Sequence, residues 1–177
     1  MNYEFDDLGL GVLHIRNDVH NDERGFFCEG YNMLEFAAGD IWNTFTQYNF
    51  SRSKAGTLRG LHFQRNYPQA KFLRVMRGEI FDVAVDIRTG SPTFGQHVEI
   101  HLGDDGSEAV FIPRGFAHGF LALKDSDVLY YVDNQYDPKG EGGILWSDPA
   151  LGVKWPYQPT LMSHKDASWF TLDKTVL

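Results

Sequence analysis

Short runs in which hydrophobic and polar residues alternate recur along the whole chain, and long helical patterns are few. Alternation with a period of two is typical of β-strands that bury one face. A more continuously apolar stretch, residues 71–88, predicts two strands around a turn at 77–79. The alternating pattern predicts further strands at residues 9–15, 44–50, 58–64, 96–102, 109–112, within 113–123, and at 128–132.

Turn and helix signals divide these strands. Residues 21–25 predict a turn before an aromatic strand, residues 103–107 a second polar turn, and residues 32–41 a short helix that ends at Gly39. An aromatic content of 15% and 18 glycines agree with many short strands and tight turns. About ten such strands are typical of a jelly roll rather than a propeller or an immunoglobulin sandwich. We therefore expect an all-β jelly-roll barrel or sandwich with short peripheral helices, one domain over residues 1–177.

The stretch G-T-L-R-G-L-H-F-Q, residues 56–64, combines two glycines, an arginine and a histidine in an apolar run. Strict alternation would place His62 on one face, with Leu58, Gly60 and Gln64, and would place Arg59 on the other, with Leu61 and Phe63. A histidine between apolar neighbours is a candidate general base. The alternative is a hydrogen-bonded histidine of the core.

The formal charge of -8 and the pI near 5.2 argue against a nucleic-acid surface, because such a protein repels backbone phosphates. A small ligand that carries phosphate remains compatible, since a few arginines in a pocket can bind it. The single cysteine, Cys28, allows no intramolecular disulfide and is expected to be a small core residue. The first residues lack a signal-peptide pattern, and no apolar run is long enough to span a membrane. We expect a cytoplasmic protein.

Metal chemistry is the next alternative, because His62, His118 and His101 could form a ligand set. Jelly-roll barrels that hold metals usually carry an H-x-H pair, and here Gln64 occupies the second histidine position. We therefore expect no metal. The chain also lacks P-loop, G-x-S-x-G, C-x-x-C and G-x-G-x-x-G patterns. Acid–base chemistry by histidine, lysine and tyrosine, without a cofactor, remains.

Six motifs in order along the chain carry a family resemblance: D-E-R-G-F-F-C-E-G-Y-N, R-G-L-H-F-Q, G-E-I-F-D-V-A-V-D-I-R with S-P-T-F-G, I-P-R-G-F-A-H-G-F, G-I-L-W-S-D-P-A-L-G-V-K-W-P and S-H-K-D. Together they resemble the dTDP-4-dehydrorhamnose 3,5-epimerases and related sugar-nucleotide epimerases, from about residue 20 to residue 166. The resemblance implies a cupin-type jelly roll that is a metal-free homodimer. It also implies a nucleoside-diphosphate 4-keto-6-deoxyhexose substrate, most simply dTDP-linked, on the route to L-rhamnose or a related deoxysugar of surface polysaccharide such as lipopolysaccharide O-antigen.

The resemblance assigns four catalytic residues. His62 would remove the acidic proton beside the ketone, and Asp166 would hydrogen-bond its other ring nitrogen. Tyr130 would be the acid on the opposite face of the sugar, and Lys71 would face the enolate oxygen. By position alone, a lysine at the start of a strand usually faces solvent.

Further residues match substrate contacts of the family. Arg24 and Arg59 would bind the diphosphate through their guanidinium forks. By position alone, Arg24 and Glu29 are surface charges at a hairpin, and Gln47 and Asn49 are either exposed polar residues of an edge strand or residues that line a pocket. The remaining matches in the nucleotide and sugar site are Phe27, Glu29, Gln47, Asn49, His118, Tyr136 and Lys165.

The chain departs from the family pattern at a few positions. Tyr131 stands where lysine is usual, Gln135 precedes Tyr136 where two aromatics are usual, and His20 stands where an aromatic is frequent. The loop between His62 and Lys71 is one residue shorter than is common. We expect these changes to lie in the parts of the site that bind the sugar and the nucleotide base of the substrate. They leave open a C3-only or C5-only epimerase, or one acting on a CDP- or GDP-linked sugar. The alternatives of other classes are a 3,4-ketoisomerase, which Tyr130 argues against, and a non-catalytic sugar-binding cupin.

Overall fold

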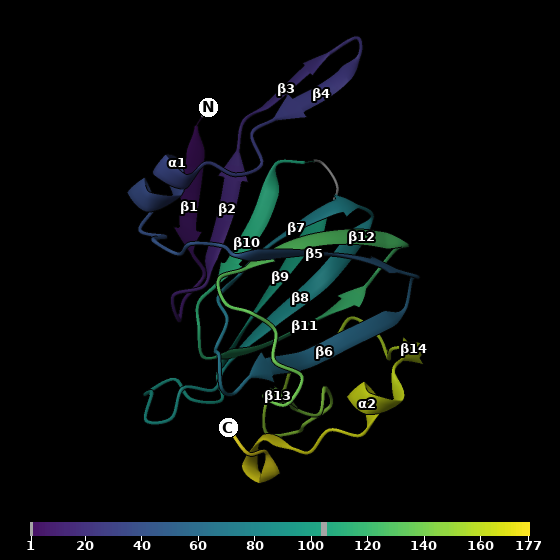
Figure 1. Cartoon of the computed structure of the whole chain (residues 1–177). Coiled ribbons are helices and arrows are strands. Elements are labelled where there is room, and N and C mark those ends of the chain that lie inside the picture. The colour runs from purple at the N-terminus through teal and green to yellow at the C-terminus, as the bar shows by residue number, and fades with distance from the viewer. Residues whose placement is uncertain (1, 104–105) are drawn as a thin grey trace.

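The computed structural model describes residues 2–103 and 106–177, and two antiparallel sheets face each other in it (Figure 1). The first sheet has the order β1 (Tyr3–Asp7), β2 (Leu13–Asn17), β10 (Glu108–Ile112), β7 (Lys71–Arg77), β12 (Ser126–Val132), β5 (Gln47–Ser53). The second has the order β13 (Glu141–Gly143), β6 (Thr57–Gln64), β11 (Phe116–Ala122), β8 (Glu79–Asp86), β9 (His97–Gly103). The short strand β14 (Leu161–Met162) pairs in parallel with β6. The architecture confirms the expected jelly-roll sandwich.

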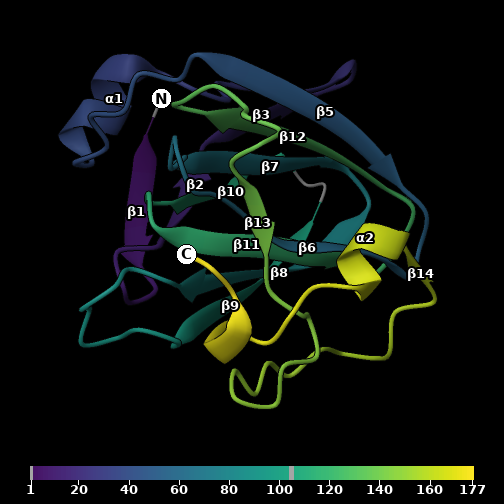
Figure 2. The same cartoon turned by 60° about the horizontal axis from the view of Figure 1, so that its bottom comes forward.

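Three peripheral elements complete the chain. The hairpin of β3 (Val19–Asp22) and β4 (Gly25–Cys28) projects away from the sandwich (Figure 1). The predicted helix is α1 (Met33–Ala38), which Asn32 caps through its side chain and Gly39 ends. Near the C-terminus, α2 (His164–Ala167) lies beside β6 and is followed by a 3-10 turn, Leu172–Lys174 (Figure 2). Both helices are short and peripheral, as expected.

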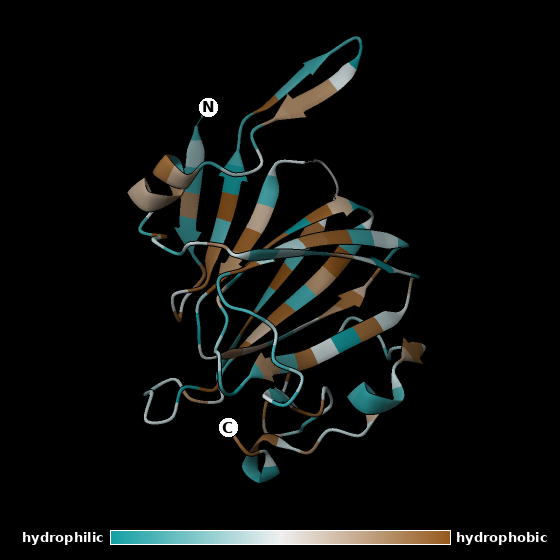
Figure 3. Cartoon of the chain, in the orientation of Figure 1, coloured by the Kyte–Doolittle hydropathy of each residue, from teal (hydrophilic) through white to brown (hydrophobic). Residues whose placement is uncertain are grey.

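Apolar side chains fill the space between the sheets and also cover their outer faces. The cluster between the sheets includes Leu73 and Val110 from the first sheet and Ile80 and Phe120 from the second. The C-terminal segment packs over the outer face of the second sheet, and α1 with its flanking aromatics packs over the first. Brown and teal bands alternate along several strands, whereas α2 is teal (Figure 3).

The apolar stretch at residues 71–88 contains two strands, but they do not form a hairpin. β7 pairs with β10 and β12 in the first sheet, whereas β8 pairs with β11 and β9 in the second. The turn at Gly78 therefore carries the chain from one sheet to the other. Seven of the eight residues after Gly78 are consecutive buried positions, which explains why β8 shows little alternation.

The start of the first predicted strand shifts for a conformational reason. The strand expected at 9–15 begins only at Leu13, because Gly9, Leu10 and Gly11 all have positive φ and form a turn. The turn expected at 103–107 includes residues 104–105, which lie outside the described residues. Cys28 is half-buried at the end of β4, outside the core clusters of the described residues.

The expected faces of residues 58–64 are wrong for Arg59. Between the pairs His62–His118 and Arg59–Phe120, β6 advances by three residues while β11 advances by two. This bulge changes the face that β6 presents, so Arg59 and His62 line the same cavity. Gly60 lies in the bulge with φ 136°, and a Cβ there would be 2.5 Å from Cα of Gly119. Only glycine allows this approach of the two strands.

The chain has no helix, within the described residues, of the length and hydropathy that crossing a membrane requires.

Candidate active site

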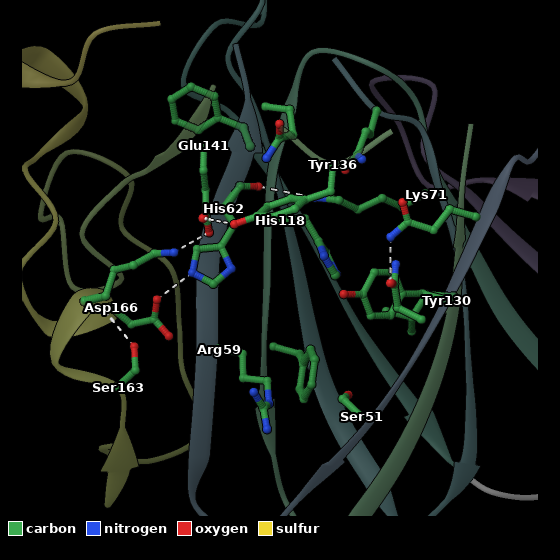
Figure 4. Close-up of a pocket in the computed structure, with 18 residues that line it drawn as sticks. Ser51, Arg59, His62, Lys71, His118, Tyr130, Tyr136, Glu141, Ser163 and Asp166 are labelled. Atoms are coloured by element: carbon green, nitrogen blue, oxygen red, sulfur yellow. Dashed lines mark hydrogen bonds and ion pairs between the residues drawn. The ribbon is translucent and has the colours of Figure 1, made fainter. Parts of the chain in front are cut away.

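A cavity of about 620 Å³ opens between the two sheets and the C-terminal segment (Figure 4). It brings together the four predicted catalytic residues and six of the nine predicted binding residues. They are His62, Lys71, Tyr130 and Asp166, with Gln47, Asn49, Arg59, His118, Tyr136 and Lys165.

His62 and Asp166 form a hydrogen-bonded pair at one wall of this cavity. Nε2 of His62, on β6, lies 2.5 Å from Oδ1 of Asp166, in α2. The backbone N–H of Asp166 donates to the Oγ of Ser163, the residue that caps α2, at 3.0 Å. Burial alone would raise the pKa of Asp166, but the bonds with His62 and Ser163 outweigh burial and lower it. The ionised carboxylate therefore holds the imidazole and leaves Nδ1 as its second nitrogen.

Lys71 stands at the start of β7, yet its side chain is buried in the cavity rather than solvated. Lys71 is only 8% exposed, and its Nζ donates to the carbonyl oxygen of His62 at 3.3 Å. Burial lowers the pKa of Lys71 to about 8, and the nearby Asp82 opposes part of this change. The expectation that this lysine faces solvent is wrong, because its strand enters the sandwich at this residue.

His118 is held in a second histidine–carboxylate pair. Its Nε2 lies 2.7 Å from Oδ2 of Asp82 on the neighbouring strand β8, and both side chains are buried. Burial lowers the pKa of His118, and Asp82 offsets only part of this effect. The sequence alone did not indicate Asp82, since the motif that contains it reads as a buried strand.

Tyr130 lies on the opposite side of the cavity from Asp166 (Figure 4). It belongs to β12 and packs against the cluster between the sheets. Burial raises the pKa of Tyr130, and nearby Arg59 offsets only part of this effect. The phenol therefore keeps its proton at neutral pH and can donate it.

Hydrogen bonds hold the polar side chains at the rim of the cavity, Gln47, Asn49 and Arg59, in place. Nε2 of Gln47 donates to Oδ1 of Asn49 at 2.8 Å, so the two side chains point into the same space. The guanidinium of Arg59 donates from Nε to Oγ of Ser53 at 2.9 Å. Gln47 and Asn49 thus line the cavity rather than an exposed strand edge, and Arg59 supplies a positive charge to the same cavity.

Glu141 joins Tyr136 and Lys165 at the mouth of the cavity. Tyr136 Oη donates to Oε2 of Glu141 at 2.6 Å, and Lys165 Nζ lies 2.5 Å from Oε1. Burial alone would raise the pKa of Glu141, but these two partners outweigh it and lower the pKa. No sequence motif points to Glu141, which lies in a segment predicted to be irregular. The cap at Ser163 is predictable from the sequence, because S-x-x-D at the start of a helix is a capping pattern.

Three predicted binding residues do not reach this cavity in the single chain. Arg24 sits at the tip of the projecting hairpin, 85% exposed at its side chain, and pairs with Asp22. Phe27 is 63% exposed on the same hairpin. Glu29 accepts from the Nδ2 of Asn32 at 3.2 Å, away from the cavity. The local structure therefore matches the alternative of surface charges at a hairpin for Arg24.

Three of the four departures from the family pattern lie outside the cavity lining, whereas the loop between His62 and Lys71 reaches the cavity through Gln69. Tyr131 follows Tyr130 on β12, so its ring points to the other face of the sheet, where it stacks with Tyr31 and Phe72. Gln135 does not line the cavity, and His20 lies on the projecting hairpin. In the single chain, Tyr131, Gln135 and His20 therefore do not surround the cavity as expected: strand alternation turns Tyr131 away, and His20 lies on the hairpin.

The arrangement is suited to moving protons on a bound molecule that carries a carbonyl group. A histidine fixed by a carboxylate and a protonated phenol occupy opposite sides of one cavity, and a buried ammonium lies between them in the wall. Such a set can remove a proton, stabilise the resulting oxyanion and return a proton from the other side.

Comparison with known proteins agrees with this geometry. A family model described as dTDP-4-dehydrorhamnose 3,5-epimerase matches residues 10–174. The chain is similar to the dTDP-4-dehydrorhamnose 3,5-epimerase of Salmonella typhimurium, with 47% identity over 94% of this chain and 93% of that protein. For the same enzyme of Methanothermobacter thermautotrophicus, identity is 45% over 90% of this chain and 88% of that protein.

A solved structure extends the similarity to the fold. The dTDP-6-deoxy-D-glucose-3,5-epimerase of Legionella pneumophila, in complex with dTDP-4-keto-L-rhamnose, superposes with a TM-score of 0.94. The two chains are 40% identical, and the match covers 98% of this chain and 94% of the other. This chain belongs to the dTDP-4-dehydrorhamnose 3,5-epimerase family.

Proposed function

We propose that this protein converts dTDP-4-keto-6-deoxyglucose into dTDP-4-keto-L-rhamnose by inverting C3 and C5, in the biosynthesis of dTDP-L-rhamnose. The observation that carries this proposal is the placement of the His62–Asp166 pair and Tyr130 on opposite sides of one cavity (Figure 4). An epimerase that works by proton exchange needs a base and an acid in this relation, because the new proton must arrive on the face opposite the lost one.

The first step is proton removal. The C4 ketone makes the hydrogens on C3 and C5 acidic, and Nδ1 of His62 takes one of them. The electron pair of the C–H bond moves into a new C=C bond, and the carbonyl π electrons move to oxygen. Asp166 stabilises the imidazolium that results, since the carboxylate already bonds Nε2. A positioned base of this kind contributes about 10²- to 10⁴-fold in rate.

The enolate oxygen then carries a negative charge, for which Lys71 is placed. Its ammonium is buried beside His62 and His118, where low dielectric strengthens the interaction. One preorganised donor to an oxyanion is worth about 3 to 4 kcal/mol. His118, held by Asp82, offers a further polar contact at the sugar.

The second step returns a proton from the other face. Tyr130 donates its phenolic proton to carbon, and the enolate electrons return to re-form the ketone. Exchange with water restores the imidazole of His62 and the phenol of Tyr130. The same residues then act on the second carbon, so the net reaction consumes nothing and needs no cofactor or metal in this proposal.

The rim residues hold the dTDP moiety. Arg59 supplies a guanidinium for the diphosphate, and Gln47, Asn49, Tyr136 and Lys165 contact sugar and nucleotide. The protein acts in the cytoplasm in this proposal, which agrees with its single cysteine.

We further propose a homodimer in which the projecting hairpin completes the site of the second copy. Arg24 and Phe27 match substrate contacts of the family but lie away from the cavity of their own chain. Phe26 and Phe27 on the hairpin, and Tyr48 and Phe50 on the edge strand β5, are exposed apolar side chains that a second copy would cover. A two-fold dimer would exchange the hairpins reciprocally.

The direct test of the activity is proton NMR of dTDP-4-keto-6-deoxyglucose mixed with the purified protein. The coupling constants of the ring protons report the configuration at C3 and at C5. The proposal predicts that both centres invert. Inversion of one centre would reduce the assignment to a single-centre epimerase, and unchanged couplings with bound nucleotide would favour a sugar-binding protein.

A further inference from the structure

The Trp169 indole packs against Gly143, next to the proposed base His62. Gly143 on β13 pairs with His62 on β6. A Cβ at Gly143 would lie 2.2 Å from Cε2 and 2.4 Å from Nε1 of the Trp169 indole. The indole therefore lies flat against the strand next to His62, and only glycine at position 143 permits this contact.

The indole also contacts the residues around the pair. Its ring centroid lies 6.4 Å from that of His62 with the planes at 72°, an edge-to-face arrangement. Nζ of Lys165 lies 5.8 Å from the centre of the Trp169 ring, within cation–π range, while it also pairs with Glu141. Trp169 thus connects the base with a residue of the cavity mouth.

The position of Trp169 matters because the base is otherwise partly open to water. The His62 side chain is 33% exposed, whereas that of Asp166 is 6% exposed. Nε1 of Trp169 is buried, and its proximity adds to the groups that lower the pKa of Asp166 against the effect of burial. The indole therefore acts on the pair through packing against His62, because its Nε1 N–H has no hydrogen-bond partner among the described residues.

We propose that Trp169 is a positioning residue for the His62–Asp166 pair, holding the imidazole in the orientation in which Nε2 meets the carboxylate and Nδ1 faces the sugar. It does not touch the reacting atoms and acts through His62. The inference rests on the proposed function, because it takes the role of His62 from there.

The first test is the rate at which variants incorporate solvent deuterium into dTDP-4-keto-6-deoxyglucose, with the affinity for dTDP measured alongside. Trp169→Ala should slow exchange about 10- to 100-fold, since a small misplacement of a catalytic group costs that much. Affinity for dTDP should change little. Trp169→Phe, which keeps an aromatic edge, should recover a large part of the loss.

A matched control is Trp155→Phe. The Trp155 indole is also half-buried, packs edge-to-face on Phe81 and donates to the carbonyl oxygen of Trp146 at 2.9 Å. This variant should lose comparable stability without slowing exchange. Equal exchange rates for Trp169→Ala and wild type, per mole of folded protein, would overturn the inference.

A second test needs no substrate. A protonated imidazole quenches the emission of an adjacent indole, so the fluorescence of Trp169 should titrate with His62. The difference between wild type and Trp169→Phe should show this titration, and the same difference in the His62→Asn background should not. The control background is needed because other charged groups face His62: Asp166, Lys165, Glu141, His118 and Lys71.

The two tests separate the inference from the proposed function. Wild-type protein that fails to exchange deuterium would contradict the proposed function, and the fluorescence titration would then still test whether the Trp169 indole lies against His62. A titration that is independent of His62 would overturn the inference even if the enzyme is fully active.

Discussion

Nε2 of His62 lies 2.5 Å from Oδ1 of Asp166 although 104 residues separate the two in the chain. The contact exists because β6 and α2 pack side by side and because the cap of Ser163 fixes the start of α2. A histidine held in this way has a defined orientation, which is what a general base requires.

Asp166→Asn tests this pair. An amide keeps the size of the side chain but loses its charge, so the imidazolium is no longer stabilised. We expect deuterium exchange to fall at least about 100-fold, with dTDP affinity largely retained. Asp173→Asn, at an exposed position of the last short helix, is the matched control and should be neutral. Normal exchange in Asp166→Asn would remove the pair from the mechanism.

Lys71 gives the reaction a specific pH dependence. Burial lowers its pKa from 10.5 to about 8, so the ammonium is present below pH 8 and is lost as the pH rises through that value. Exchange should therefore decline above about pH 8, well before an ordinary lysine would titrate. The pH profile of the exchange rate measures this.

Lys71→Arg separates charge from titration at this position. Arginine keeps its charge far above pH 10, so the alkaline decline should disappear from whatever activity remains. Lys54→Arg, at an exposed site, should leave the wild-type profile unchanged. A profile in Lys71→Arg that still falls near pH 8 would assign the decline to another group.

Tyr130→Phe should affect inversion more than proton removal. Without the phenol, His62 can still take a proton and return a deuteron to the same face, so exchange without inversion should persist. Mass spectrometry measures the exchange and NMR the configuration. Tyr131→Phe is the matched control, since that ring lies on the other face of β12 in an aromatic cluster. Unimpaired inversion in Tyr130→Phe would contradict the assigned acid role.

How far the sequence predicts the site can be seen on β12 and β6. Alternation places Tyr130 and Tyr131 on opposite faces of β12, which is regular over these residues, and this rule overrides the expectation that Tyr131 lies beside the sugar. On β6 the same rule fails, because the bulge at Gly60 changes the face and brings Arg59 beside His62. A period-two pattern carries no information about where a strand gains a residue relative to its neighbour.

Gly60→Ala tests this bulge. A methyl group would lie 2.5 Å from Cα of Gly119, at a φ that side chains rarely adopt. We expect a loss of stability of about 1–3 kcal/mol or more, seen as a lower Tm, together with slower exchange. Gly103→Ala is the control, since nothing lies within 4 Å of its added Cβ. Equal stability of both variants would show that the bulge tolerates a side chain.

Other parts of the site depend on tertiary structure that motifs do not encode. Lys71 reads as a solvated strand end until the packing of β7 is known, and Asp82 and Glu141 are identified only by the partners that they meet. Arg24 and Phe27 carry family motifs, but a single chain leaves them outside the cavity.

A dimer that combines one Arg24→Ala chain with one His62→Asn chain tests the proposed exchange of hairpins. Arg24→Ala impairs the contribution of the hairpin, and His62→Asn removes the base. In a mixed dimer one site would contain both a normal Arg24 and a normal His62, so about half of the wild-type activity should return. Co-expression with two affinity tags isolates the mixed species, and sedimentation measures its size. A mixed dimer without activity would show that Arg24 does not serve the partner site.

The most direct measurement is deuterium incorporation from D₂O into dTDP-4-keto-6-deoxyglucose, counted separately at C3 and C5 by NMR and mass spectrometry, for wild type and His62→Asn side by side. We expect deuterium at both carbons with wild type and almost none with His62→Asn. Label at one carbon only would contradict a double inversion, and wild-type incorporation by His62→Asn would contradict the role of His62 as the base.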